Sequence, residues 1–365
     1  MSPLTILPAP TPLTPRPYPP AGLTASPEAD PAERSTRPTR LIDAFGRHLT
    51  YLRVSVTDRC NLRCLYCLPE DADFPFGDRD FLSPAEIEGL VGALVRLGIR
   101  RIRLTGGEPL VRKDILEIAR RIKAIPGVED LALSTNGTEL ERLALPLKEA
   151  GVDRVNVSLD TLDPEVFREI TRRGDLEQVW RGVEAALAAG LEPVKLNAVL
   201  MERTGLEDVD RLVDLTLDRP LAVRFIEMMA TDVNRHLQPG QYLSCDEARR
   251  RIEERFGPLE PIAAEAALRT GPAKAFRIPE ARGTVGFITP LSHTFCAECN
   301  RLRLTSRGEL RLCLFADRVY PLRHLADAPA ALEGEILRVL ADKPAEHMLL
   351  QGSSGNLVSF MQIGG

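Results

Sequence analysis

Short runs of β-branched and aliphatic residues alternate with amphipathic segments between Leu52 and about Met229. The runs predict strands at 52–57, 101–105, 130–135, 154–159, 193–200 and 222–228, and the amphipathic segments predict helices at 84–97, 114–124, 139–150, 176–189 and 207–217. Regular alternation of strands and helices predicts an α/β fold with a parallel sheet and right-handed crossovers. The pattern leaves open whether this is an open sheet or a partial barrel.

The predicted strands are polar on one face only. The polar positions are Arg53, Ser55, Thr57, Arg101, Arg103, Thr105, Asn156, Ser158, Asp160, Lys195 and Asn197, with apolar residues between them. Side chains of one parity share a face, so one face packs under helices and the other faces a polar space. An exposed face of an antiparallel sheet is the alternative, which the intervening helices disfavour. We therefore expect a wet, concave lumen.

Cations stand out on this polar face. Arg53, Arg103 and Lys195 would be costly to bury without partners, and arginine and lysine commonly bind phosphate. Three cations in the lumen of an acidic protein indicate an anionic substrate such as a polyphosphate. Internal salt bridges to Asp160 or Glu108 are the alternative for any single one of them.

Length, charge and composition narrow the class of protein. The chain has 365 residues and a formal net charge of −5, which disfavours nucleic acid as the main partner. No apolar run approaches the roughly 20 residues that span a bilayer, so we expect a soluble protein with no membrane partner. Residues 1–40 contain eleven prolines and lack the apolar core of a signal peptide, so we expect a disordered tail.

Six of the seven cysteines fall into two groups of three. The first group follows the first predicted strand with the spacing C-x3-C-x2-C, and consists of Cys60, Cys64 and Cys67. The second has the spacing C-x2-C-x13-C and consists of Cys296, Cys299 and Cys313. Groups of three indicate metal binding in a reducing compartment and not a disulfide framework. In an iron–sulfur cube, three thiolates leave one iron open for a small molecule. Cys245 is expected to be an ordinary thiol.

Zinc is the main alternative for both groups. Zinc sites usually use C-x2-C pairs, which the first spacing fits poorly. His293 could complete a zinc knuckle with the second group, but that interpretation gives no reason for Arg301 and Arg303 to follow Cys299. A zinc-binding nucleic-acid module would also need four ligands at each site.

A glycine turn follows the second predicted strand, with the sequence Gly106-Gly107-Glu108-Pro109. Two glycines would let the backbone approach a ligand closely. The chain has no G-x4-G-K-[ST] motif, so this turn is not a Walker loop.

The motifs together resemble one known family. The first cysteine group and the glycine turn resemble the cluster-binding and S-adenosylmethionine (SAM) binding elements of radical SAM enzymes. The further motifs are Ser134-Thr135-Asn136-Gly137, Asn156-Val157-Ser158-Leu159-Asp160, Arg224-Phe225-Ile226-Glu227, the run 295–304, Cys313-Leu314-Phe315 and the final Gly364-Gly365. With them, the chain from about Leu41 to Gly365 resembles the GTP 3′,8-cyclase family of molybdenum cofactor biosynthesis.

The resemblance implies a domain plan and a set of site residues. It implies a radical SAM partial (β/α)6 barrel at 41–230, after the tail at 1–40, and a C-terminal cluster-binding region with a Gly-Gly tail at 231–365. The first cysteine group would hold a [4Fe–4S] cluster that binds SAM, and the second would hold a [4Fe–4S] cluster whose open iron engages guanine. The positions that match SAM contacts are Tyr66, Gly107, Ser158 and Met229. The positions that match GTP contacts are Arg53, Arg103, Ser134, Lys195, Arg301, Leu302 and Arg303. The positions that match the catalytic residues are Arg224, Arg301, Arg303, Gly364 and Gly365.

Two of these matches carry their own expectations. Met229 has the opposite parity to Arg224, so a strand end or bulge should lie between them. Gly364 and Gly365 would fray in solvent on sequence grounds alone. The resemblance instead implies that the pair reaches into the active site.

The implied reaction converts GTP to 3′,8-cyclo-7,8-dihydro-GTP. A 5′-deoxyadenosyl radical from SAM would take hydrogen from C3′, and the carbon radical would attack C8 of guanine. The implied partners are GTP, a low-potential electron donor and the cyclic pyranopterin monophosphate synthase that receives the product, all in the cytoplasm. The oligomeric state is open, with a homodimer among the options. The alternative is a radical SAM enzyme that modifies a peptide and carries an auxiliary cluster, for which a peptide-recognition domain and more cysteines would be expected.

Overall fold

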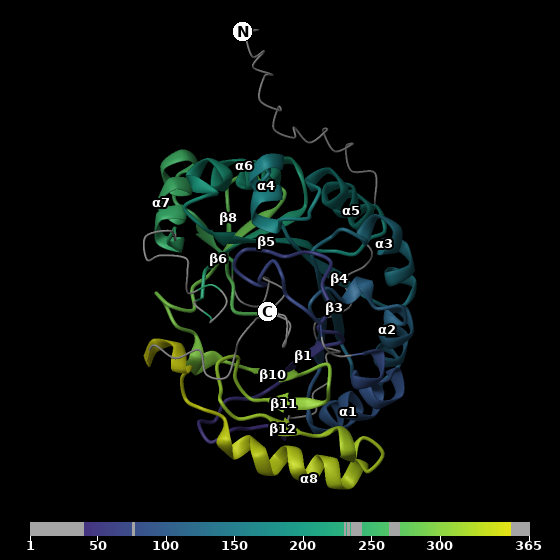
Figure 1. Cartoon of the computed structure of the whole chain (residues 1–365). Helices are drawn as coiled ribbons and strands as arrows, with labels where there is room; N and C mark the ends of the chain where they lie inside the picture. The colour runs from purple at the N-terminus through teal and green to yellow at the C-terminus, as the bar shows by residue number, and fades with distance from the viewer. Residues whose placement is uncertain are drawn as a thin grey trace.

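The computed structural model describes residues 40–74, 77–229, 231, 234, 243–262 and 271–351. In these ranges the helices α1 to α6 lie outside a curved sheet whose strands face the interior (Figure 1). The predicted tail at 1–40 lies outside the described residues except for Arg40, and Gly364 and Gly365 lie outside them as well.

Six parallel strands form the middle of the sheet and pair in chain order. They are β1 (Tyr51–Ser55), β2 (Arg101–Thr105), β3 (Asp130–Thr135), β4 (Arg154–Ser158), β5 (Val194–Leu200) and β6 (Leu221–Glu227). Pairing between neighbours in chain order, with a helical crossover each time, is the topology of a (β/α) barrel wall.

Strands from the C-terminal part extend the sheet at both edges. β10 (Arg301–Leu304) pairs parallel with β1, and β9 (Thr284–Ile288) pairs parallel with β6. Antiparallel strands continue beyond them: β11 (Glu309–Arg311) and β12 (Tyr320–Pro321) on one side, β8 (Lys274–Arg277) and β7 (Glu260–Pro261) on the other. Across the described residues this makes one 12-stranded sheet in the order β12-β11-β10-β1-β2-β3-β4-β5-β6-β9-β8-β7.

The helices connect these strands. They are α1 (Pro84–Leu97), α2 (Ile115–Lys123), α3 (Leu140–Glu149), α4 (Pro164–Thr171), α5 (Leu176–Ala188), α6 (Gly205–Asp218), α7 (Cys245–Phe256) and α8 (Pro329–Val339). The start of α1 shows why they form where they do. The Ser83 hydroxyl accepts from the Glu86 N–H at 3.2 Å, and the Glu86 carboxylate accepts from the Ser83 N–H at 2.7 Å. None of the helices in the described ranges has the length and apolar character that a bilayer crossing requires.

The predicted elements are confirmed. All six strands and all five helices are present, with ends within two residues of the predicted ones. The parallel sheet with helices outside it confirms the α/β partial barrel with a C-terminal extension. Helix α4 was not predicted, and its N-cap Asp163 accepts from the N–H groups of Glu165 and Val166 at 2.9 and 3.1 Å.

The two faces of the strands separate as the alternation predicted. Leu52, Val54 and Ile102 have no exposed surface and belong to the main hydrophobic core under the helices. Residues of the other parity, such as Arg53 and Arg103, line an interior cavity instead. The lumen of the barrel therefore lies on the polar face.

Candidate active site

The first cysteine group lies in a loop that follows β1 and packs against the end of α4. The Arg63 N–H donates to the carbonyl of Thr171 at 3.1 Å. Arg172 has a left-handed backbone (φ 60°), and its Nη1 donates to the carbonyls of Arg63 and Leu68, each at 3.0 Å. The helix that the strand pattern did not predict thus holds the loop that carries the three thiols.

The glycine turn runs against the backbone just beyond β1. The Gly107 N–H donates to the Thr57 carbonyl, and the Glu108 N–H donates to the Arg59 carbonyl, both at 2.8 Å. A Cβ on Gly106 would lie 2.5 Å from the Thr57 carbonyl oxygen, and one on Gly107 would lie 2.4 Å from that of Arg59. What requires glycine here is therefore this close approach of the chain's own backbone. Gly107 also lines the cavity.

Tyr66 is fixed by a buried carboxyl group. Its hydroxyl donates to Asp160 Oδ2 at 2.9 Å, while the Val199 N–H donates to Asp160 Oδ1 at 2.8 Å. Burial raises the pKa of Asp160 to about 6, although both of these hydrogen bonds favour its ionised form. The Tyr66 ring is thereby held at the side of the cavity next to the first cysteine group.

The second cysteine group lies at the opposite end of the barrel from the first. Tyr51 at the start of β1 pairs in register with Arg301 at the start of β10, and Cys299 comes just before that point. The first group follows the other end of β1, about 16 Å away for a strand of five residues. β11 runs back alongside β10 and brings Cys313 to the same end as Cys299.

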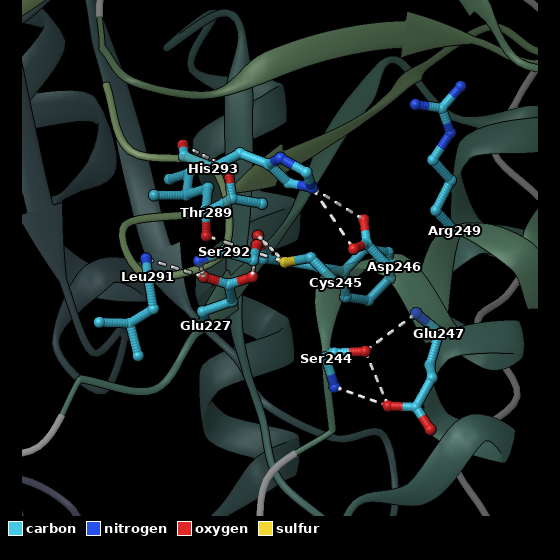
Figure 2. Close-up of polar contacts among 12 residues, drawn as sticks. Glu227, Ser244, Cys245, Asp246, Glu247, Arg249, Thr289, Leu291, Ser292 and His293 are labelled. Atoms are coloured by element: carbon cyan, nitrogen blue, oxygen red, sulfur yellow. Dashed lines mark hydrogen bonds and ion pairs between the residues drawn. The ribbon is translucent and has the colours of Figure 1, made fainter. Parts of the chain in front are cut away.

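The loop that leads to Cys296 is anchored at the end of β6. Glu227 accepts from the N–H groups of Leu291 and Ser292 at 3.0 and 3.1 Å, and from the Ser292 hydroxyl (Figure 2). His293, the alternative zinc ligand, points its ring toward the exposed Asp246, with Nε2 3.3 Å from Oδ1 (Figure 2). His293 is not among the residues that line the cavity.

Cys245 lies beside this loop in the same view and is buried (Figure 2). Its Sγ lies 3.7 Å from the carbonyl oxygen of Phe225 and 3.8 Å from that of Ile288. Burial raises the pKa of its thiol to about 12, so the thiolate that reacts and binds metals is disfavoured.

A concentration of positive charge separates the two cysteine groups. Burial, with repulsion from Arg303 and Arg103, lowers the pKa of Arg53 well below its usual value. Burial and repulsion from Arg103 lower the pKa of Arg224 to about 9. Burial and repulsion from Arg301 lower the pKa of Arg303 to about 10. Cations that destabilise one another in this way favour an anion between them.

One cavity of about 330 Å³ connects these parts. Its walls include both cysteine groups and most of the predicted ligand residues, namely Arg53, Tyr66, Arg103, Gly107, Ser134, Ser158, Arg224, Met229, Arg301 and Arg303. β6 ends at Glu227, so the strand end expected between Arg224 and Met229 is present.

Two predicted substrate residues do not line this cavity. The side chain of Leu302 has no exposed surface and belongs to the hydrophobic core on the opposite face of β10, so only its backbone could contact a substrate. Lys195 is 2% exposed and lies near Arg224, Arg154 and Arg103, outside the set of residues that line the cavity.

The donor set fits iron–sulfur clusters at both ends. All seven cysteines lie in the described residues, and none is in a disulfide. Burial raises the pKa of Cys60 to about 11. Burial acts in the same direction on Cys299, but Arg301 and Lys343 outweigh it and lower the pKa to about 7. At Cys299 the thiolate form that ligates metals is thus favoured, whereas burial raises the pKa of Cys296.

Three buried polar residues of the cavity wall were not predicted to bind a ligand. The Tyr51 hydroxyl, Asn197 Oδ1 and His347 Nδ1 are buried at its wall without a hydrogen-bond partner in the structure as described. Buried polar atoms normally have partners, so these three fit a polar ligand. Asn197 was already predicted to face the lumen, Tyr51 has the same inward parity and could have been found from it, and nothing in the pattern distinguished His347.

Comparison with known proteins shows the family of this chain. Residues 54–216 match the radical SAM superfamily, and residues 221–349 match the family described as Molybdenum Cofactor Synthesis C. The GTP 3′,8-cyclase of Pelotomaculum thermopropionicum is 47% identical over 85% of this chain and 96% of its own length. That of Pseudomonas entomophila is 45% identical over 90% of this chain and 98% of its own.

Solved structures share the fold. Streptococcus suis SuiB bound to S-adenosylmethionine aligns with a TM-score of 0.59 over 83% of this chain and 68% of SuiB, at 16% identity. SuiB bound to its precursor peptide SuiA aligns with a TM-score of 0.57 at 15% identity. At such identity the likeness concerns the fold alone.

A parallel half-barrel whose first strand leads into C-x3-C-x2-C, with a glycine turn packed beside it, defines a radical SAM protein. The second cysteine group at the far end of the same cavity narrows that class. The chain belongs to the GTP 3′,8-cyclase family.

Proposed function

We infer that this protein is a GTP 3′,8-cyclase, a radical SAM enzyme that converts GTP to 3′,8-cyclo-7,8-dihydro-GTP in molybdenum cofactor biosynthesis. The observation that carries this conclusion is the single cavity lined by two cysteine groups with a cluster of cations between them. A triphosphate needs the cations, and a radical reaction needs the enclosure.

Two [4Fe–4S] clusters and SAM are the cofactors. We assign Cys60, Cys64 and Cys67 to the cluster that binds SAM, and Cys296, Cys299 and Cys313 to the cluster beside the substrate. Bound there, the first cluster and SAM would supply the radical chemistry that the cyclisation of GTP between C3′ and C8 requires.

The chain's own residues bind and orient the two small molecules. Tyr66, held by Asp160, and the backbone at Gly107 would receive SAM, together with Ser158 and Met229. The substrate contacts proposed at the cavity wall are Arg53, Arg103, Ser134, Arg301 and Arg303, with Arg224 close by. Lys195 and the backbone of Leu302, which do not line the cavity, complete the proposed set. This arrangement would place C3′ of GTP toward the first cysteine group, where SAM binds, and guanine toward the second cysteine group at the other end of the cavity.

The surroundings of the enzyme form part of the proposal. GTP is the substrate, and a low-potential donor supplies the electron that a radical SAM enzyme requires. We propose that the product passes to cyclic pyranopterin monophosphate synthase, that the protein works in the cytoplasm, and that it could do so as a homodimer. Residues 231–365 would act as the region that carries the second cluster and the Gly364-Gly365 tail.

Anaerobic reconstitution tests the proposal. The protein is loaded with iron and sulfide, reduced, and incubated with SAM and GTP. We expect equal amounts of 5′-deoxyadenosine and cyclised nucleotide, with ATP as a substrate control. The variant Cys64→Ala should form neither. Release of 5′-deoxyadenosine without any change in GTP would contradict the assigned substrate, and no release at all from the iron-loaded protein would contradict the radical SAM activity.

A further inference from the structure

A buried lysine lies directly against the second cysteine group. Lys343 is 3% exposed and follows α8 in the chain. Its Nζ lies 3.8 Å from Cys299 Sγ, donates to the carbonyl of Arg301 at 3.2 Å, and donates to the carbonyl of Leu312. Burying an ammonium group is costly, so a lysine is kept here only with such a set of acceptors.

These acceptors belong to two separate segments of the second cysteine group. Arg301 begins β10 and Cys299 lies two residues before it, whereas Leu312 directly precedes Cys313 after β11. The two strands pair at Arg303 and Arg311, but their ladder ends before it reaches the cysteines. Lys343 therefore closes the gap of 13 residues between the second and third cysteines at the point where the thiols must converge.

Arg47 fixes the segment that carries Lys343. Its Nη1 donates to the carbonyls of Cys296 and Ala345 at 2.9 Å each, and its Nη2 donates to that of Pro344 at 2.6 Å. Asp43 neutralises this buried arginine through a contact of 2.6 Å to Nε. The carbonyl of Cys296 is thus tied to the residues that directly follow Lys343.

The same short segment reaches Cys296 a second time. The backbone N–H of His347 hydrogen-bonds to the Cys296 thiol. Lys343 at Cys299 and Arg47 at the Cys296 carbonyl thus hold two of the three cysteines directly, and Lys343 holds the third through the carbonyl of Leu312, which precedes Cys313. Contacts of this kind to the groups around metal ligands set the orientation of the ligands and the properties of the metal.

We propose that Lys343 is a positioning residue for the second cluster, which holds the cysteine ligands in place and keeps a positive charge beside the thiolates. The inference rests on the proposed function, because it requires a cluster at Cys296, Cys299 and Cys313. Three thiolates give the ligand set a negative charge, so an adjacent ammonium group stabilises the reduced cluster. Loss of that charge lowers the reduction potential.

The experiment observes the second cluster by itself. In a background that carries Cys60→Ala, Cys64→Ala and Cys67→Ala, only the second cysteine group can bind iron. The variants Lys343→Met, Lys343→Arg and Lys148→Met are compared in this background. Lys148 is an exposed lysine of α3 that also donates to a backbone carbonyl, that of Gly190, and serves as the matched control. The readouts are iron per chain, the electron paramagnetic resonance spectrum of the reduced cluster, and its midpoint potential.

In the starting background and in Lys148→Met we expect about four irons per chain. In Lys343→Met we expect less than half of that iron, and a lower potential in the fraction that retains a cluster. Lys343→Arg keeps the charge, so it should restore iron binding and potential but change the spectrum through its different shape. Full iron in Lys343→Met with an unchanged spectrum and potential would overturn the inference.

Two controls keep the outcomes separate. If the background itself binds no iron, the proposed second cluster fails, and with it the basis of this inference. If thermal melting, compared with that of Lys148→Met, shows that Lys343→Met does not fold, the Lys343→Arg variant tests the positioning role instead. A spectrum of Lys343→Arg identical to that of the background would then reject a positioning role.

Discussion

Binding of GTP should draw a proton onto Lys195. This residue is 2% exposed, and its pKa is lowered to about 5. Burial is the main cause, followed by repulsion from Arg224, Arg154 and Arg103, while Asp130 acts weakly in the opposite direction. Asp130 is engaged by Arg154 in a two-point ion pair with contacts of 2.5 and 2.6 Å, so its charge is largely used there.

The size of the effect follows from this pKa. At pH 8 a lysine with a pKa of about 5 is protonated in about one molecule in a thousand. A triphosphate among these cations favours the ammonium form and returns the pKa toward 10.5. Roughly one proton is then taken up per GTP bound, and affinity should fall about tenfold per pH unit as the pH rises through this range. Below about pH 5 the lysine is already charged, so the uptake disappears.

Anaerobic titration calorimetry measures this uptake directly. GTP is titrated at pH 8, where its phosphates are fully ionised, in buffers of different ionisation enthalpy, and the slope gives protons per GTP. Lys195→Met should reduce the uptake to near zero and weaken GTP binding by about 1–3 kcal/mol. Lys148→Met should leave both unchanged. Uptake near zero in the unmodified protein, or equal uptake in Lys195→Met, would refute the reasoning.

Three further outcomes are expected. Protein reconstituted without oxygen should hold about eight irons per chain, and zinc near one with iron near four would reject the second cluster. Removal of Gly364 and Gly365 should abolish cyclisation while iron content and GTP binding persist. Full turnover of the truncated protein would show that the pair has no role in the reaction. Glu227→Gln should lower the free energy of unfolding, measured by chemical denaturation, by about 1–3 kcal/mol, because two N–H groups and the Ser292 hydroxyl lose a charged acceptor. An unchanged denaturation midpoint would show that Glu227 does not anchor the loop.

The fold of the barrel was predictable because its signals are local. Strand and helix periods are read within a few residues, and the parity of Arg53 and Arg103 already separated lumen from core. Helix α4 was not predicted, because it is only eight residues long and lies with α5 in the same connection between β4 and β5. Strands β9 and β10 were not predicted, because short strands at the edges of a sheet depend on partner strands far away in the chain.

The candidate site was predictable to the same extent. Cysteine spacing and inward parity identified most of the cavity wall, since both are visible in the sequence. Arg47 and Lys343 were invisible, because what defines them is contact with carbonyls up to 298 residues away. The side-chain orientation of Leu302 follows from strand parity, which places it opposite Arg301 and Arg303.

The pairing of β10 with β1 has a consequence for the newly made chain. The Thr50 and Asn300 backbones that meet at the start of this pair are 250 residues apart. At a synthesis rate of about 5–20 residues per second, the edge of β1 waits roughly 10–50 s before its neighbour is made. An uncovered parallel edge is a template for pairing with other chains during that time. The ribosome-bound half-barrel is therefore the form of this protein most exposed to aggregation, and the C-terminal strands end that exposure when they dock.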